Sequence, residues 1–160
     1  MAGMNAGRWT HQRDDAGVVV FLIGVRINRL RSVRAWLPVV RAMPRMLAEL
    51  GRDPELGLLG VTSCVHGKGA LAVHYWRDLD SLLAYAHAAD HEHRPAWREF
   101  NRTVRDSGGA VGIWHETFVV PAGAHESMYV DMPAQGLPLV LGARTVGAGR
   151  ERTRDRLDAA

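Results

Sequence analysis

The alternation of apolar and polar positions along this chain predicts four strands. The run Val18–Ile27 is almost wholly apolar and rich in β-branched residues, which is typical of a central strand buried on both faces. Leu58–Val65 and Ala70–Trp76 are two further strand-like runs, and the glycines between them suit a tight turn, so together they predict a hairpin. Val111–Val120 completes the set as a fourth strand.

Helical spacing follows the first strand. Ser32 is a suitable N-cap, and the apolar positions from Trp36 to Leu50 recur at the period of a helix. Pro44 lies inside this segment, so we expect the helix to be kinked there or divided in two. Gly51 is expected to end it.

A second helical segment follows the hairpin. Asp78 is a suitable cap for its first part, and the polar residues Ala89–Glu92 interrupt it. Pro95 suits the first turn of its second part, which we expect to run as far as the glycines that begin at Gly108.

The order of elements predicts an α+β fold of the ferredoxin-like βαββαβ type, with one antiparallel sheet and helices on one face. The other face must also be apolar, so we expect a symmetric homodimer to cover it, with either Ile23 or Ile113 directed at the partner. We expect a flexible N-terminus at 1–16, a single domain at 17–146 with a short edge strand at Glu126–Met132, and a flexible polar tail at 147–160.

Composition narrows the classes of partner and cofactor. The net charge is only +3, and the arginines are not gathered with stacking aromatics, so a nucleic-acid partner is not expected. The one cysteine, Cys64, excludes a disulfide framework, and no apolar run approaches the length of a membrane span. We expect a cytoplasmic protein with no membrane partner. Gly67-Lys68-Gly69 is too short for a dinucleotide fingerprint, and there is no flavin or nicotinamide motif.

Three short motifs resemble a known family: Tyr75–Arg77 (YWR), His93–Trp97 (HRPAW) and Gly112–Thr117 (GIWHET). Over roughly Val18 to Gly142 the chain is similar to a family named after a monooxygenase of fumagillin biosynthesis. That family is related to the antibiotic-biosynthesis monooxygenases and belongs to the dimeric α+β barrel superfamily. The resemblance implies an oxidoreductase that acts on an apolar small molecule. The wider superfamily also contains haem-binding enzymes, including haem-degrading monooxygenases and aldoxime dehydratases, in which a histidine on a helix facing the sheet binds iron.

His93 is the first candidate for a catalytic residue. His93, Trp97 and Phe100 are four and three residues apart, so a helix places them on one face, directed at the sheet. The imidazole would act as an acid or base near neutral pH or, as the resemblance allows, as the axial ligand of a haem iron. Trp97 and Phe100 would contact the substrate. The alternative is that His93 only hydrogen-bonds the backbone at the start of its helix.

The strands supply the remaining candidates. Alternation puts His74 and Trp76 on one face, where His74 would be catalytic and Trp76 would contact substrate, although a buried neutral histidine fits equally well. Trp114 and Glu116 share a face on the last strand, and His115 lies on the other. A carboxylate within an apolar strand requires a partner, for which Arg26 and Arg77 are suitable.

Glu116 would therefore orient a histidine or accept a proton, or else form an ion pair at a subunit interface. Trp114 and Arg26 are further candidates for substrate binding. The residues thus favour a monooxygenase-like oxidoreductase of undetermined cofactor. The alternatives are a haem enzyme of the same superfamily, such as a haem-dependent dehydratase or monooxygenase, and a non-catalytic protein that binds small molecules.

Overall fold

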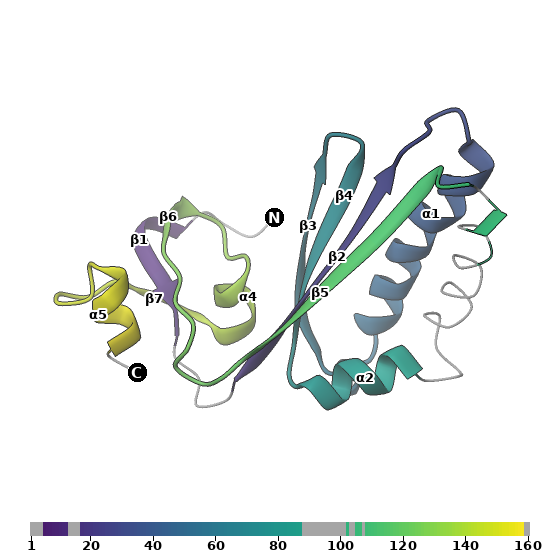
Figure 1. Ribbon diagram of the computed structural model, residues 1–160. Helices are drawn as coiled ribbons and strands as arrows, with labels where there is room; N and C mark the ends of the chain where they lie inside the picture. Colours follow the sequence, from purple (N-terminus) through teal and green to yellow (C-terminus); the bar gives the residue numbers. More distant parts are fainter. Residues whose placement is uncertain (1–4, 13–16, 88–101, 103–104, 107, 159–160) are drawn as a thin grey trace.

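A four-stranded antiparallel sheet forms the centre of the protein in the computed structural model, which describes the chain except residues 1–4, 13–16, 88–101, 103–104, 107 and 159–160 (Figure 1). Its strands are β2 (Val18–Ile27), β3 (Leu58–His66), β4 (Gly69–Trp76) and β5 (Val111–Val120), in the order β3-β4-β2-β5. Helices α1 (Val33–Leu50) and α2 (Leu79–His87) lie on one face, and a short 3-10 turn, η1 (Pro54–Leu56), precedes β3. The ferredoxin-like fold predicted from the sequence is confirmed.

A second, three-stranded sheet stands beside the first and was not predicted. It consists of β6 (Tyr129–Met132), β1 (Asn5–His11) and β7 (Ala143–Thr145), in that order, and Trp9 stacks on Tyr129 in it at 4.8 Å between ring centroids. Two short helices, α4 (Leu137–Leu141) and α5 (Thr153–Asp158), accompany it.

The chain ends therefore contain regular structure where the sequence suggested flexible segments. The strand expected within Glu126–Met132 is present as β6, but it pairs with β1 in the second sheet and not at an edge of the first. In the C-terminal tail, Arg156 of α5 donates to Glu126 at 2.8 Å, with the arginine side chain almost fully buried. Each of these contacts joins residues far apart in sequence, which periodicity does not detect.

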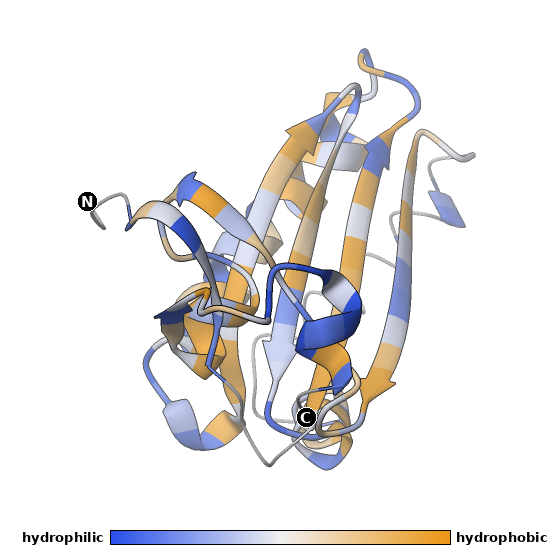
Figure 2. Ribbon diagram, turned by 90° about the vertical axis from the view of Figure 1, so that its left-hand side faces the viewer, coloured by the Kyte–Doolittle hydropathy of each residue, from blue (hydrophilic) through white to orange (hydrophobic). Residues whose placement is uncertain are grey.

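The register of the main sheet sorts its side chains into two faces. Phe21 lies opposite His74, and Val19 lies opposite Trp76, so these residues face the helices. The buried core on this side consists of Val19, Leu50, Trp76, Leu82 and Tyr85. All four strands contain apolar residues (Figure 2), and the register places Leu22, Val73, Trp114 and Phe118 on the other face, which we call the outer face. Trp114 and Phe118 are 40% and 49% exposed there.

The expectation that Ile23 or Ile113 would point at a partner subunit is wrong. Ile23 lies opposite His115, and Val25 lies opposite Ile113, so both isoleucines are on the helix-facing side of the sheet. The sequence determines alternation within a strand but not the register between strands, and this register places the two isoleucines on the same side.

Helix α1 runs without a break through both of its prolines, Pro38 and Pro44, so the predicted division at Pro44 does not occur. Pro44 has no N–H, so the carbonyl of Val40 loses its helical hydrogen bond. Both residues are exposed, so water can bind that carbonyl instead.

Ser32 makes no side-chain cap for α1. By contrast, Asp78 caps α2 as predicted, since its Oδ1 accepts from the Ser81 N–H at 2.6 Å. Across the described ranges, no helix combines the length and the apolar character that a membrane crossing requires.

Gly24 has a packing role in the middle of β2. The indole of Trp114, on the neighbouring strand β5, lies across this glycine, and a Cβ at Gly24 would overlap the indole nitrogen. The missing side chain therefore allows a large aromatic residue to lie flat on the outer face.

Gly24→Ala should consequently displace Trp114 and destabilise the protein by about 1–3 kcal/mol, measured by thermal or urea unfolding. Gly112→Ala on β5 is the matched control, because a Cβ added there would lie 3.8 Å from its nearest neighbour, the Asn28 amide nitrogen. Equal stability of the two variants would contradict the assigned packing of Trp114.

Candidate functional site

Five rings gather on the helix-facing side of the main sheet, and we call them the aromatic cluster. Its members are Phe21, His74, Trp76, Tyr85 and His115. Their ring centroids are 5.8 Å apart for Phe21 and His74, 5.5 Å for Phe21 and His115, 6.4 Å for His74 and Trp76, and 5.8 Å for Trp76 and Tyr85. Central strands β2 and β4 supply three of these rings, so they are held by the most extensively paired part of the sheet.

His74 is the member of this cluster that is suited to acid–base chemistry. Its side chain is only 5% exposed, and desolvation lowers its pKa from 6.5 to about 4, so the imidazole is neutral at physiological pH. Neither ring nitrogen has a hydrogen-bond partner among the described residues. A neutral imidazole offers one donor and one acceptor, and burying both without partners is costly. A ligand hydroxyl would donate to the unprotonated nitrogen, and a ligand hydroxyl or carbonyl oxygen would accept from the ring N–H.

Tyr85 and Glu49 link the two helices beside this cluster. The Tyr85 hydroxyl donates to Glu49 Oε2 at 2.8 Å, which joins α2 to the end of α1 next to Trp76. Sequence reasoning did not identify Glu49 as part of the site. The available signal was that Glu49 is the only acidic residue in α1 and lies in its last turn, an unfavourable place for a negative charge.

The structure separates the predicted site residues into two groups. His74 and Trp76 belong to the aromatic cluster, whereas Trp114 and Glu116 lie on the outer face, and so does Arg26. Within the described part of the chain, then, the sheet stands between these two groups, and they do not form one pocket. His93, Trp97 and Phe100 lie outside the described residues.

Within the single chain, Glu116 forms no ion pair with either of its suggested partners among the described residues. Glu116 lies opposite Leu22 on an edge strand and is exposed, so its charge is solvated in a single subunit. Its two suggested partners are engaged elsewhere: Arg26 donates to Asn28 at 3.1 Å, and Arg77 pairs with Asp78 at 3.3 Å. Strand hydrophobicity indicated burial because it does not distinguish an edge strand from a central one.

A second polar cluster, which the sequence did not reveal, lies in the smaller sheet. His11 Nδ1 is 2.8 Å from Ser127 Oγ, and His11 Nε2 is 3.0 Å from His125 Nδ1. The backbone N–H of His11 also donates to the same Ser127 hydroxyl at 3.2 Å. This chain of contacts ties the end of β1 to the segment before β6. Among the described residues, no group of three or more histidine, cysteine or acidic side chains could hold a metal ion.

Comparison with known proteins supplies a family. Residues 18–137 match the family model described as monooxygenase af470-like. The curated protein monooxygenase af470 of Aspergillus fumigatus is 34% identical over 145 residues, covering 83% of this chain and 49% of the relative. The chain thus spans about half the length of that relative.

Solved structures are similar in fold. An aldoxime dehydratase in complex with butyraldoxime aligns with a TM-score of 0.63 and 15% identity, over 89% of this chain and 43% of the other. SnoaB, a cofactor-independent oxygenase from Streptomyces nogalater, aligns with a TM-score of 0.46 and 14% identity, over 64% of this chain and 92% of the other. At these identities the similarity to the dehydratase concerns the fold alone.

The burial of His74 predicts a specific pH dependence. Because its folded-state pKa is about 4 and the unfolded value is 6.5, the unfolded chain binds more protons between these values, and stability falls as pH drops through this window. The loss should reach about 3 kcal/mol in the free energy of unfolding. In His74→Leu that contribution disappears, which urea unfolding at several pH values measures.

His66→Gln is the control, because His66 lies exposed at the β3–β4 turn and should leave the wild-type pH profile in place. Parallel profiles for wild type and His74→Leu between pH 4 and 6.5 would contradict a buried, neutral His74.

Proposed function

Because the chain belongs to the monooxygenase af470-like family, we propose that it is a monooxygenase-like oxidoreductase acting on an apolar small molecule. The observation that supports a site on the helix-facing side of the sheet is His74: a buried, neutral imidazole without a described hydrogen-bond partner, held between Phe21 and Trp76. Apolar walls with few polar groups are the usual composition of small-molecule sites.

In this proposal Phe21 and Trp76 pack against the apolar body of the substrate, and His74 binds its one polar group. The neutral imidazole would accept the proton of a phenolic or enolic substrate hydroxyl, and the negative charge would delocalise onto the conjugated carbon that then reacts with oxygen. In a monooxygenation, one atom of O₂ enters the substrate and the other leaves as water. The two electrons beyond those of the C–H bond come from the substrate or from an external reductant.

The remaining predicted residues take secondary roles. We propose that His93, Trp97 and Phe100 complete the site from the helical segment, as their spacing suggests. Arg26, Trp114 and Glu116 lie on the outer face, where they would serve substrate binding or catalysis only if a second subunit closed that face. Haem would require an axial ligand, for which the sequence indicates His93.

We also propose that the protein is a homodimer that buries the outer face. Trp114 and Phe118 of β5 are exposed on this face, and Leu22 of β2 and Val73 of β4 lie on the same face. Together they form a continuous apolar patch, whereas apolar residues on a monomer surface are usually scattered singly. A symmetric partner would cover the same face on both copies at once. The double length of the A. fumigatus relative is compatible with two such units in one chain.

Phe118→Asp should abolish dimerisation at micromolar concentration, because it buries an unpaired charge at the centre of the interface. The dissociation constant should rise by about a hundred-fold or more. Size-exclusion chromatography with light scattering measures the mass. Val65→Asp is the control, since Val65 is 85% exposed on the helix-facing side. A wild-type monomer at this concentration would contradict the dimer.

The proposed activity is tested with ¹⁸O₂ and a panel of planar phenolic and terpenoid compounds, with product mass as the readout. Wild type should incorporate one ¹⁸O atom, and His74→Leu should lower kcat/KM by about a hundred-fold or more through loss of proton transfer. His87→Gln, an exposed substitution on α2, is the control.

Other results would redirect the assignment. Loss of activity in Glu116→Gln but not in His74→Leu would move the site to the outer face. Turnover only after haem addition, with a Soret band lost in His93→Ala, would assign the haem alternative. Tight retention of a compound without any product would favour a non-catalytic binding protein.

A further inference from the structure

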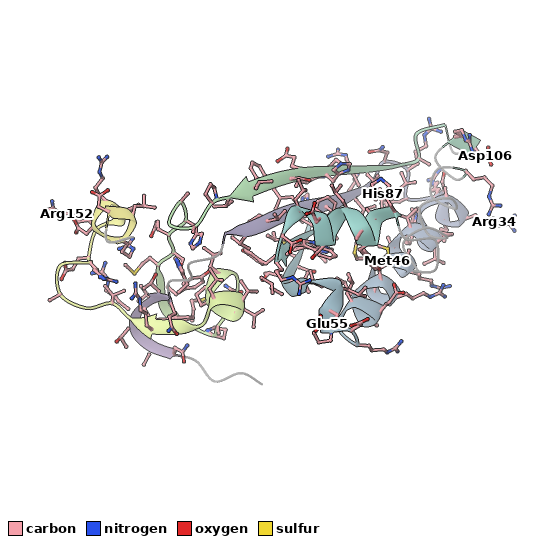
Figure 3. The ribbon with its side chains drawn as sticks, turned by 90° about the horizontal axis from the view of Figure 1, so that it is seen from below. Arg34, Met46, Glu55, His87, Asp106 and Arg152 are labelled. Carbon is pink, nitrogen blue, oxygen red and sulfur yellow. The ribbon has the colours of Figure 1, made fainter. Side chains whose placement is uncertain are left out.

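The solvent-facing side of α1 carries four arginines in one row. Arg34, Arg41, Arg45 and Arg52 are separated by seven, four and seven residues. At 100° per residue these spacings bring all four to within about 20° of a common line, along roughly 27 Å of helix and its C-terminal turn. All four side chains are exposed, and Arg34 extends away from the protein at one end (Figure 3). We call them the arginine row.

None of these four arginines has an intramolecular side-chain partner among the described residues, in contrast to Arg77, Arg154 and Arg156. Arg77, Arg154 and Arg156 each pair with a carboxylate at 3.3, 3.3 and 2.8 Å. Within the ranges that the structure describes, no ion pair or side-chain hydrogen bond involves any member of the arginine row.

The one carboxylate on α1 forms no ion pair with the row among the described residues. The single acid of this helix, Glu49, accepts a hydrogen bond from Tyr85. Like charges four residues apart repel, so Arg41 and Arg45 destabilise the isolated helix. A row that lowers stability and serves no described internal contact is suited to an external anion.

Aliphatic side chains accompany the arginines on the exposed arc. Val33 and Val40 directly precede Arg34 and Arg41, and they are 45% and 38% exposed. Leu30, just before the helix, is 57% exposed. One residue is a rotation of 100°, so Val33 and Val40 form a second row beside the first, and the opposite side of α1 packs inward with Leu50 in the core.

We propose that the outer side of α1 docks on an anionic phospholipid surface. Guanidinium groups bind phosphate oxygens in pairs, and a flat headgroup layer contacts a straight row along its whole length without a required register. Exposed aliphatic side chains next to cations can enter the boundary between headgroups and acyl chains. This arc has no aromatic side chain to stack on bases, which disfavours nucleic acid.

The choice of lipid over an acidic protein rests partly on the proposed function, because apolar substrates partition into membranes. Docking through α1 would hold the aromatic cluster on the far side of a single helix from the lipid. Peripheral attachment needs no spanning segment, so it is compatible with the absence of a membrane-crossing helix from the described ranges. It revises the expectation that a membrane is not a partner.

The test is sedimentation of the full chain with vesicles of phosphatidylcholine containing about one third phosphatidylserine, against pure phosphatidylcholine. The protein should bind only the anionic vesicles. Each arginine should contribute about five-fold, so Arg41→Gln with Arg45→Gln should lower the partition coefficient about twenty-five-fold. Arg152→Gln with Arg154→Gln removes the same charge from the exposed C-terminal region and should have little effect.

Circular dichroism of both double variants establishes that they are folded. Equal losses in both, or no binding to anionic vesicles by wild type, would overturn the proposal. So would heparin binding that depends on the arginine row without any vesicle binding, since the row would then serve another polyanion. Vesicle binding is measured without substrate, so its failure is separate from a failure of the oxygenation assay.

Discussion

Strand β2 pairs with β4 on one side and with β5 on the other, and the register of these two ladders decides which side chains face the helices. A slip of one residue would exchange the two faces of a strand completely. In the observed register, Val19 and Trp76 meet in the core beneath α1 and α2, and His74 is carried inward with them. The candidate site is therefore a consequence of sheet pairing and needs no loop to position it.

The inward placement of His74 has an energetic cost that the core offsets. A buried neutral imidazole without described partners loses the hydrogen bonds it would have to water. Trp76, which is 1% exposed, and its neighbours Val19 and Leu82 gain free energy by burial in the same layer. Polar groups that are costly in a resting core are common at functional sites, where a ligand later satisfies them. His74 is the residue that best fits this description within the described part of the main domain.

The strands of the main sheet could be predicted from the sequence because the signals for them are local. The apolar run of β2 and the glycines of the β3–β4 turn lie within single short segments, and so does the Asp78 cap. The second sheet could not be predicted, because β1 has little apolar character and pairs with strands more than 100 residues away. The continuous path of α1 through Pro44 depends on solvent exposure, which a sequence pattern does not report.

The candidate site shows the same division between local and long-range information. Alternation correctly separated Trp114 from His115 and put His74 beside Trp76, since these relations hold within one strand. It did not determine that Glu116 is exposed in the single subunit or that Ile23 and Ile113 share a face, because both depend on the pairing between strands. The hydrogen bond between Tyr85 and Glu49 joins residues that lie 36 positions apart on two different helices, and no spacing rule predicts such a contact.

The second sheet also limits how the outer face can be used. Helix α4 packs on this face at the β3 edge, where Gly60 leaves room for Val140 and Leu139. Further along, the hydroxyls of Tyr75 and Tyr129 both approach Gly136, whose φ of +61° and missing side chain permit the contact. Burial raises the pKa of both phenols, and the neighbouring Tyr75 raises that of Tyr129 further, so both remain neutral donors. The chain thus occupies the β3 margin of its own outer face. A second copy would have to centre on β2 and β5, where Leu22, Trp114 and Phe118 lie.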